Sequence, residues 1–342
     1  MPGVTHATFI ESMKRKTFGG RRSSTDRRKR SQSEDSSAST DSFSSASSAT
    51  SSSDEYAAGL VSKVAIHAVR TCTLHSATVT GSKHKNNEDR FVASFDIAAS
   101  TNRCGQDSAA IFAVFDGHGG DFCSQYLQEN FLYHVQNSKR GKWFAALEDG
   151  IAESERKFCR QARRIRDDSG ACLIALVITP ANEYVCAGVG DCRCILGVGW
   201  TKSIRIQALS RDHTANAEQA RIRRAGGYVR NGRVSGVLEP ARTIGDLDVK
   251  DEKNSGVNAI PEMKHGHVVP GELHVFVLAS DGLWDVFSNA DVINFVHSKI
   301  ANSKGLPCKT RAESQNVSSL LVEEAVARGS RDDITVLVNI VW

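Results

Sequence analysis

The sequence contains no apolar run that approaches the ~20 residues needed to cross a bilayer, so we expect no membrane-spanning segment. Its first residues lack the apolar core of a secretory signal, and no glycine follows Met1 directly, which argues against N-myristoylation. None of the nine cysteines forms a Cys-x-x-Cys pair, which argues against a zinc site. Their odd number and scattered spacing indicate reduced thiols, so we expect a cytoplasmic and/or nuclear protein.

Aromatic residues make up only 7% of the chain, and the formal net charge of +4 is small for 342 residues. No recognisable nucleic-acid module is present, so we expect no nucleic-acid partner. Hydrophobic residues at 40% and charged residues at 24% are typical of a soluble globular protein. The length fits two domains or one large α/β domain.

The first 55 residues differ in composition from the rest. Residues 31–53 are mostly Ser, Thr, Ala and Asp, with Phe43 as the only large apolar residue. Such a segment buries too little apolar area to offset its ordering entropy, so we predict that residues 1–55 are disordered. A basic cluster within residues 21–30 fits either a nuclear-import signal or a solvated tail. Residues 56–342 are predicted to form the folded domain.

Apolar runs bounded by turn residues predict strands, and helical spacing of apolar residues predicts helices. The predicted strands are Arg90–Phe95, Ala110–Phe115, Cys172–Thr179, Tyr184–Val189, Arg193–Val198, Leu273–Ala279 and Ile334–Val341. The predicted helices run from Phe122 to Leu132, Trp143 to Arg163, Thr214 to Ala225, Asp291 to Ile300 and Ser314 to Ala327. The strands between residues 172 and 198 predict an antiparallel meander. Because strands and helices occur in batches, antiparallel sheets with helices outside are favoured over a parallel doubly wound fold.

Residues 109–120 read Ala-Ala-Ile-Phe-Ala-Val-Phe-Asp-Gly-His-Gly-Gly, a buried strand followed by a glycine-rich turn. The turn carries Asp116 and His118, and its glycines let backbone atoms approach a ligand closely. A carboxylate beside an accessible carbonyl suits a hard cation such as Mg²⁺ or Mn²⁺. Taken alone, the stretch is better explained as a strand followed by a tight polar turn than as a metal site.

Other acidic residues repeat this arrangement. Ser280-Asp281-Gly282 ends another apolar run, and Asp332 precedes the final apolar strand. Carboxylates placed repeatedly at the ends of buried strands are the ligands that a multi-metal oxygen site requires. Together these residues favour a metal site over a set of unrelated turns.

The ordered motifs resemble those of the type-2C, metal-dependent protein serine/threonine phosphatases. They are Asn-Glu-Asp, Asp-Gly-His-Gly-Gly, Ser-Gly-Ala-Cys, Gly-Asp-Cys-Arg, Asp-His-Thr, Arg-Ala-Gly-Gly, Ala-Arg-Thr-Ile-Gly-Asp, Asp-Gly-Leu-Trp-Asp and Gly-Ser-Arg-Asp-Asp-Ile-Thr-Val. The resemblance extends from about Ala77 to Trp342. It implies an α+β fold with a central β-sandwich of two antiparallel sheets flanked by helices, in four αββα layers.

The resemblance also implies a site for two Mg²⁺ or Mn²⁺ ions. Asp116 would bridge the two ions, while Glu88 and the Gly117 carbonyl hold one of them. Asp281 and Asp332 would hold the other ion.

Three further residues receive roles from the same resemblance. Asp89 matches a position that acts through metal-bound water. Asp191 matches the position that, with Asp281, supports a weaker third ion. His118 matches the proposed general acid, which protonates the serine or threonine alkoxide as it leaves.

The chain departs from the family pattern at the phosphate-binding position. The family usually has an arginine four residues before the metal-binding glutamate, and here that position is His84, flanked by Lys83 and Lys85. Neither histidine nor lysine offers the bidentate contact that arginine makes with phosphate. Either a neighbouring lysine replaces the arginine or the substrate is held more loosely.

A second departure lies in the last motif, which normally reads Asp-Asn and here reads Asp332-Asp333. We expect Asp333 to point outward, the alternative being that its charge tightens metal binding. Arg242 matches an arginine near the catalytic face, and a surface salt bridge explains it nearly as well.

The resemblance implies a monomeric phosphatase acting on phosphoserine and phosphothreonine proteins. A catalytically inactive scaffold is one alternative, but such a protein should have lost metal carboxylates, and Glu88, Asp116, Asp281 and Asp332 are all present. A phosphodiester-cleaving or nucleic-acid-binding protein is the other alternative, suggested by the basic tail.

Overall fold

The computed structural model describes residues 61–67, 70–98, 108–200, 203–251, 254–304, 306 and 308–342. The tail that the sequence predicts to be disordered, residues 1–55, lies outside the described residues. In the described part of the chain, no helix is both long enough and apolar enough to cross a membrane.

The first sheet has six strands, and every pair of neighbours is antiparallel. In spatial order its strands are β1 (Val61–His67), β2 (Arg70–Val79), β14 (Ile334–Val341), β13 (His274–Ala279), β7 (Arg193–Val198) and β8 (Arg205–Ala208).

The second sheet is also antiparallel throughout. Its main strands in spatial order are β12 (Glu262–His267), β6 (Glu183–Val189), β5 (Gly170–Ile178), β4 (Ser108–His118) and β3 (Arg90–Ala98). The short β11 (Ile244–Gly245) pairs with β5.

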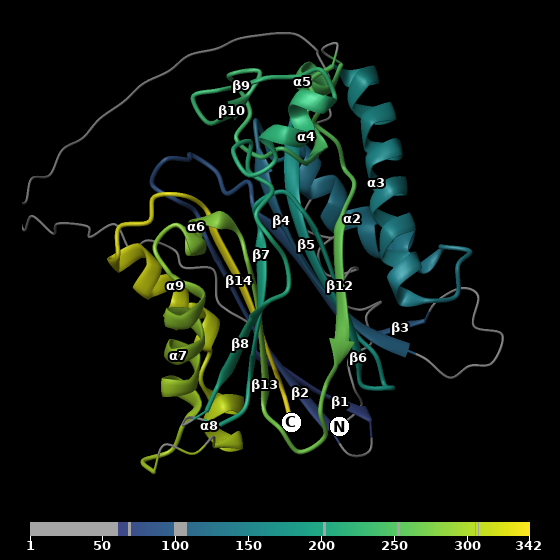
Figure 1. Ribbon diagram of the computed structural model, residues 1–342. Helices are drawn as coiled ribbons and strands as arrows, with labels where there is room; N and C mark the ends of the chain where they lie inside the picture. Colours follow the sequence, from purple (N-terminus) through teal and green to yellow (C-terminus); the bar gives the residue numbers. More distant parts are fainter. Residues whose placement is uncertain are drawn as a thin grey trace, which may run out of the picture. The chain divides into compact units, whose positions relative to one another are not determined.

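Helices cover the outer face of each sheet. They are α2 (Phe122–Gln136) and α3 (Trp143–Ile165) on the second sheet, and α6 (Asp281–Trp284), α7 (Asn289–Ile300), α8 (Lys309–Ser314) and α9 (Val317–Ala327) on the first. Figure 1 shows α3 and α7 on opposite sides of the strands. The predicted four-layer sandwich is therefore confirmed.

Strand β4 illustrates how the sequence specifies these layers. Alternate residues such as Ile111 and Phe115 pack against the helices, whereas Phe112 and Val114 pack in the core between the two sheets. Successive side chains of a strand point to opposite faces, so a strand covered on both faces needs a continuous apolar run. This is why residues 109–115 are apolar without interruption.

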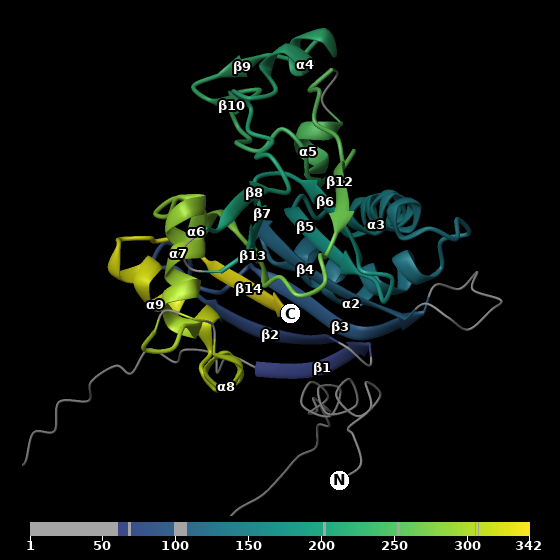
Figure 2. The same cartoon turned by 60° about the horizontal axis from the view of Figure 1, so that its bottom comes forward.

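Residues 214–261, here named the flap, connect β8 to β12. The flap contains α4 (Gln219–Arg224), β9 (Val229–Arg230), β10 (Arg233–Val234), β11 and α5 (Leu247–Lys250). It has a small core of its own, formed by Ala215, Ile222, Val234 and Ala241. Figure 2 shows α4, β9 and β10 projecting beyond the ends of the strands.

The predicted meander over residues 172–198 is wrong in one respect. Strands β5 and β6 pair, but β7 lies in the other sheet between β13 and β8. The chain crosses between the sheets at Gly190, whose φ is 99°. A Cβ there would lie 2.3 Å from Cys172 Sγ, so the crossing requires glycine. Turn residues alone do not distinguish a hairpin from a crossing of this kind.

Two predicted helices begin too early. Helix α4 starts at Gln219, because Thr214 instead forms a backbone bridge with Pro240. Helix α9 starts at Val317, after Asn316 accepts hydrogen bonds from the backbone N–H groups of Ser318 and Ser319.

One buried histidine leads to a prediction about acid stability. His297 on α7 is 2% exposed, and neither ring nitrogen has a hydrogen-bond partner among the described residues. Burial lowers its pKa from 6.5 to about 4. Because the unfolded chain binds the proton first, stability is lost as the pH falls from 6.5 towards 4. We expect this histidine to cost about 2 kcal/mol of unfolding free energy between about pH 7 and about pH 5.

Urea denaturation of wild type and His297→Leu at both pH values measures this contribution. When the pH is lowered, His297→Leu should lose about 2 kcal/mol less unfolding free energy than wild type. His267→Leu changes an exposed histidine and serves as the matched control. It should lose as much unfolding free energy as wild type when the pH is lowered. An identical pH response in all three proteins would contradict the assignment.

Candidate active site

Three carboxylates gather where central strands end. Asp116 lies near the end of β4, Asp191 lies in the turn between β6 and β7, and Asp281 begins α6 after β13. One carboxylate oxygen of each lies within 4.8 Å of the other two. Figure 1 shows β4, β7 and α6 approaching one another below the flap. The two sheets therefore bring together three of the predicted metal ligands.

This proximity has an electrostatic cost. Burial is the largest cause that raises the pKa of each of Asp116, Asp191 and Asp281. The charges of neighbouring carboxylates raise the pKa of Asp116 and Asp281 further. A bound cation would remove this repulsion and favour the ionised carboxylates.

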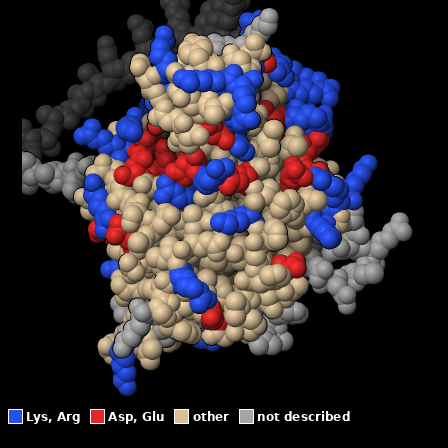
Figure 3. All heavy atoms as spheres, in the orientation of Figure 1, with Lys and Arg blue, Asp and Glu red and all other residues tan. Residues whose placement is uncertain are grey.

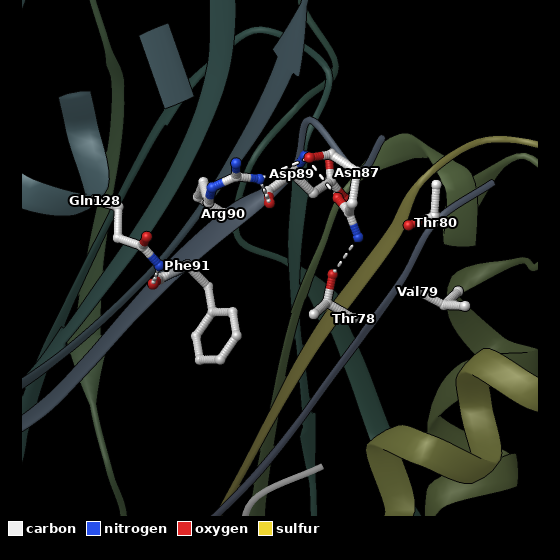
Figure 4. Close-up of a pocket in the computed structure, with 8 residues that line it drawn as sticks. All are labelled: Thr78, Val79, Thr80, Asn87, Asp89, Arg90, Phe91 and Gln128. Carbon is white, nitrogen blue, oxygen red and sulfur yellow. Dashed lines mark hydrogen bonds between the residues drawn. The ribbon is translucent and has the colours of Figure 1, made fainter. Parts of the chain in front are cut away.

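Asp89 lies directly before β3 and is 4% exposed. Its Oδ2 accepts a hydrogen bond of 2.7 Å from Ser280 Oγ, whereas Oδ1 has no hydrogen-bond partner among the described residues. Burial raises the pKa of Asp89 to about 7, opposed in part by the hydroxyl groups of Ser280 and Thr335. Asp89 also borders a pocket of about 280 Å³, shown in Figure 4 with Gln128 and Thr80 on opposite sides. Asp89 thus offers a buried oxygen that can accept a further hydrogen bond.

Gly117 and Glu88 meet through their backbones. A Cβ at Gly117 would lie 2.4 Å from the Glu88 carbonyl oxygen, so no larger residue fits at this position. Ser124 Oγ donates to the same Glu88 carbonyl. The Glu88 carboxylate does not join the group of three carboxylates, although its charge contributes to the raised pKa of His118.

Asp332 is held at the rim of the site by Lys83. Lys83 Nζ lies 2.9 Å from Asp332 Oδ2, and this hydrogen bond is the largest cause that raises the pKa of Lys83. The charges of Asp281 and Asp285 act in the same direction. Lys85 is exposed and forms no ion pair in the described part of the chain. Of the two lysines, Lys83 is therefore the one beside the carboxylates.

The expectation that Asp333 points outward is wrong. Asp333 is 3% exposed, and its carboxylate accepts hydrogen bonds of 2.7 Å from both the Gly81 and Glu88 backbone N–H groups. His84 Nδ1 also lies 3.1 Å from Asp333 Oδ2, and this contact raises the pKa of His84. Asp333 therefore organises the loop that carries Glu88, and His84 is directed towards it.

His118 pairs with Asp246. His118 Nε2 lies 2.8 and 3.0 Å from the two Asp246 carboxylate oxygens. Burial lowers the pKa of His118, but the hydrogen bond and charge of Asp246 outweigh it, so the pKa is raised. The pair therefore favours the protonated imidazolium, the form that a general acid requires.

Asp246 belongs to one of the family-like motifs, yet the sequence alone assigns it no role. Its carboxylate fills the space that a side chain at Gly170 would occupy, since a Cβ there would lie 2.1 Å from Asp246 Oδ2. Gly245 and Asp246 both have positive φ angles, 85° and 53°. The only signal in the sequence is the Gly245-Asp246 pair itself, because the positive φ angles appear only in the structure.

His213 is a second residue whose role the sequence does not reveal. Its Nδ1 accepts a hydrogen bond of 3.2 Å from Gly190 N–H, and its own backbone N–H donates to the Gly190 carbonyl at 2.9 Å. Its Nε2 lies 3.4 Å from Glu262 Oε2. Burial lowers the pKa of His213, which favours the neutral ring that can accept at Nδ1. His213 thus holds the turn that carries Asp191.

Arg193 holds the other end of that turn. Its Nε and Nη2 donate to the two carboxylate oxygens of Asp212, and its Nη1 donates to Asn289 Oδ1 at 2.8 Å. Its guanidinium carbon lies 4.9 Å from the centre of the Trp284 ring. Residues 212 and 213 therefore fix the Asp191 turn from both sides.

Arg242 forms an ion pair, as one of the two interpretations expected. Its side chain is 13% exposed, and Nε donates to Glu218 Oε2 at 2.9 Å. Glu218 also pairs with Arg221. Burial raises the pKa of Glu218, but the two arginines outweigh it and lower the pKa to about 2. The pair lies within the flap rather than on an open surface.

The acidic residues form one continuous feature of this face. Figure 3 shows a band of acidic side chains beneath the flap, bordered by lysines and arginines. A band of this sign attracts cations.

Comparisons with known proteins agree with this arrangement. A family model described as Protein phosphatase 2C matches residues 74–334. Integrin-linked kinase-associated serine/threonine phosphatase 2C of Bos taurus is 33% identical over 278 residues, covering 73% of this chain and 72% of its own. Protein phosphatase 2C homolog 2 of Hypocrea jecorina is 32% identical over 231 residues, covering 64% of this chain. This chain spans only 51% of the length of that relative.

Solved structures show the same fold. The serine-threonine phosphatase 2C from Toxoplasma gondii superposes with a TM-score of 0.63 at 21% identity, covering 83% of this chain and 99% of that one. The family match spans well over half of the sequence and includes the three clustered carboxylates. The chain therefore belongs to the protein phosphatase 2C family of metal-dependent serine/threonine phosphatases.

Proposed function

We propose that this chain hydrolyses phosphoserine and phosphothreonine in proteins at a site for two Mg²⁺ or Mn²⁺ ions, with a weaker third. The observation that supports this most is the group formed by Asp116, Asp191 and Asp281, within 4.8 Å of one another. Oxygen ligands of this kind suit both cations. Asp89, whose charge acts on Asp116, adds an oxygen, Oδ1, that has no hydrogen-bond partner among the described residues and could face a cation or its bound water.

The proposed ligands divide between the ions as the family resemblance implies. Asp116 would contact both ions, Glu88 and the Gly117 carbonyl would hold one, and Asp281 and Asp332 would hold the other. When bound, such ions lower the pKa of water and neutralise charge on phosphoryl oxygens.

Asp89 would act through water, and Asp191 would join Asp281 at the third ion. His118 holds the proton for the leaving alkoxide. Its Nε2–H donates to Asp246, so the proton that can be transferred is the one on Nδ1. Lys83 places a positive charge at the rim, where it attracts the phosphate.

Phosphate release from a phosphothreonine peptide tests this function. The purified chain, freed of metal with a chelator, is assayed alone and after addition of Mn²⁺ or Mg²⁺. We expect turnover only with a cation. A folded protein that binds Mn²⁺ but releases no phosphate would instead support an inactive scaffold. Equal activity with chelator present would contradict the metal-dependent mechanism.

His213 gives a prediction about metal affinity. His213→Leu removes the acceptor for Gly190 N–H, and His213 holds the turn that carries Asp191. The variant should therefore weaken binding of the third, weaker Mn²⁺ ion about 10- to 100-fold. His213→Asn keeps an oxygen near the position of Nδ1 and should retain most of the affinity. His213→Gln places its amide nearer the position of Nε2 and should resemble the leucine variant. Calorimetric titration measures all three, and equal affinities would contradict this role.

A further inference from the structure

The outer surface of the flap is strongly basic. Residues 219–237 contain five arginines and no acidic residue. Arg221 is directed inward, where it donates to the backbone carbonyls of Gly256 and Ala241, and Arg233 pairs with Glu239. The other three arginines need a different explanation.

Arg223, Arg224 and Arg230 form no ion pair with any residue that the structure describes. All three are exposed. On α4, Ile222 is fully buried in the flap core, and the two arginines that follow it face solvent. The three arginines therefore carry positive charge that no described acidic side chain neutralises.

The same segment exposes apolar area. Tyr228 is 52% exposed and Val237 is 57% exposed. Arginine and tyrosine are enriched at protein interfaces, where guanidinium groups bind carboxylates or phosphates and the ring adds contact area. A surface of this composition fits a protein chain that carries negative charge.

The basic surface lies beside the acidic band. Figure 3 shows blue side chains on the flap directly above the red band. Glu239 of the flap contributes to the raised pKa of Asp285, four residues after Asp281, so the two regions are close in space. An extended peptide advances about 3.3 Å per residue, so residues near a phosphate bound at the carboxylates can reach the flap.

We propose that Arg223, Arg224 and Arg230 bind anionic residues that flank the phosphorylated residue of a protein substrate. This proposal rests on the proposed function and adds a substrate class to it. The anionic groups are carboxylates or additional phosphates. A large polyanionic surface, such as duplex nucleic acid or a membrane, fits less well because it would also face the acidic band.

Three phosphothreonine peptides with the same central sequence test the proposal. Their flanking residues are Gln in the first, Glu in the second, and Gln with one added phosphonate analogue of phosphoserine, which cannot be hydrolysed, in the third. For wild type, KM for the anionic peptides should be about tenfold lower than for the Gln peptide, equivalent to ~1.4 kcal/mol. The preference should shrink as salt rises from about 0.05 M to about 0.5 M, because exposed charges are screened.

The variant Arg223→Gln/Arg224→Gln/Arg230→Gln should reduce this KM ratio to near one. Arg160→Gln/Arg164→Gln/Arg166→Gln removes the same charge from exposed positions at and beyond α3 and should keep the wild-type ratio. Comparing the two anionic peptides identifies which anion the surface prefers.

An equal KM for all peptides with wild type would overturn the proposal, and so would an unchanged ratio in the flap variant. Loss of oligonucleotide binding in the flap variant, without a change of that ratio, would assign the surface to nucleic acid instead. No turnover of any peptide by wild type would mean that the proposed function itself fails. If the triple variant does not fold, the single variants Arg223→Gln, Arg224→Gln and Arg230→Gln replace it, and a KM ratio unchanged in all three overturns the proposal.

Discussion

Replacing Asp116 with Asn should reduce hydrolysis of a phosphothreonine peptide by at least about 10³-fold. Asp116 is the residue proposed to contact both cations, and one of its carboxylate oxygens lies within 4.8 Å of an oxygen of Asp191 and of Asp281. An amide supplies one neutral oxygen where the carboxylate supplies two charged ones, so the site loses both charge and a ligand atom. Phosphate release at saturating Mn²⁺ measures the loss.

Asp285→Asn is the matched control, because Asp285 is an exposed neighbour of the same sign and lies outside the group of three. It should retain activity close to wild type. Equal activity losses in the two variants would show that overall charge, not the ligand position, matters.

Without metal, Asp116→Asn should also raise the thermal stability of the protein, since burial and repulsion disfavour the charged form of Asp116 in the folded state.

Replacing His118 with Gln should lower turnover of the phosphothreonine peptide about 10²- to 10⁴-fold. The threonine alkoxide is a poor leaving group, so it benefits from a proton donated by the imidazolium. p-Nitrophenyl phosphate releases a phenolate that needs no such proton, so the variant should lose much less activity on that substrate. Comparing kcat for the two substrates measures the effect.

Asp246→Asn tests how His118 keeps its proton. Because Asp246 raises the pKa of His118, Asp246→Asn should lower turnover less than His118→Gln does. The loss should again be larger for the phosphothreonine peptide than for p-nitrophenyl phosphate. If His118→Gln lowers turnover of both substrates equally, His118 binds phosphate or supports the structure instead of donating a proton.

Strands were the part of the fold that sequence patterns predicted best. The final strand has the predicted bounds, Ile334–Val341, and β7 also matches Arg193–Val198. Both are short apolar runs bounded by turn residues, and local sequence specifies such strands well. The sheet to which a strand belongs depends on contacts distant in sequence, which is why the sequence pattern wrongly predicts that β7 pairs with β6.

The site shows the same limit. Asp116 and Asp281 were found because each follows a buried apolar run, a pattern visible in the sequence. The direction of a side chain in a loop is not visible in this way. The prediction that Asp333 faces outward is therefore wrong, since its carboxylate accepts hydrogen bonds from two backbone N–H groups. The contact of His213 with Gly190 spans 23 positions and joins two loops, so no local signal indicates it.

The central claim is that the clustered carboxylates bind the cations on which hydrolysis depends. The most direct test is calorimetric titration of the metal-free protein with Mn²⁺, with phosphate release measured in parallel samples at each Mn²⁺ concentration. We predict two strongly bound ions in wild type, activity that rises as they bind, and loss of both signals in Asp116→Asn. Activity that is complete before Mn²⁺ binds, or Mn²⁺ binding that is unchanged in Asp116→Asn, would contradict the account.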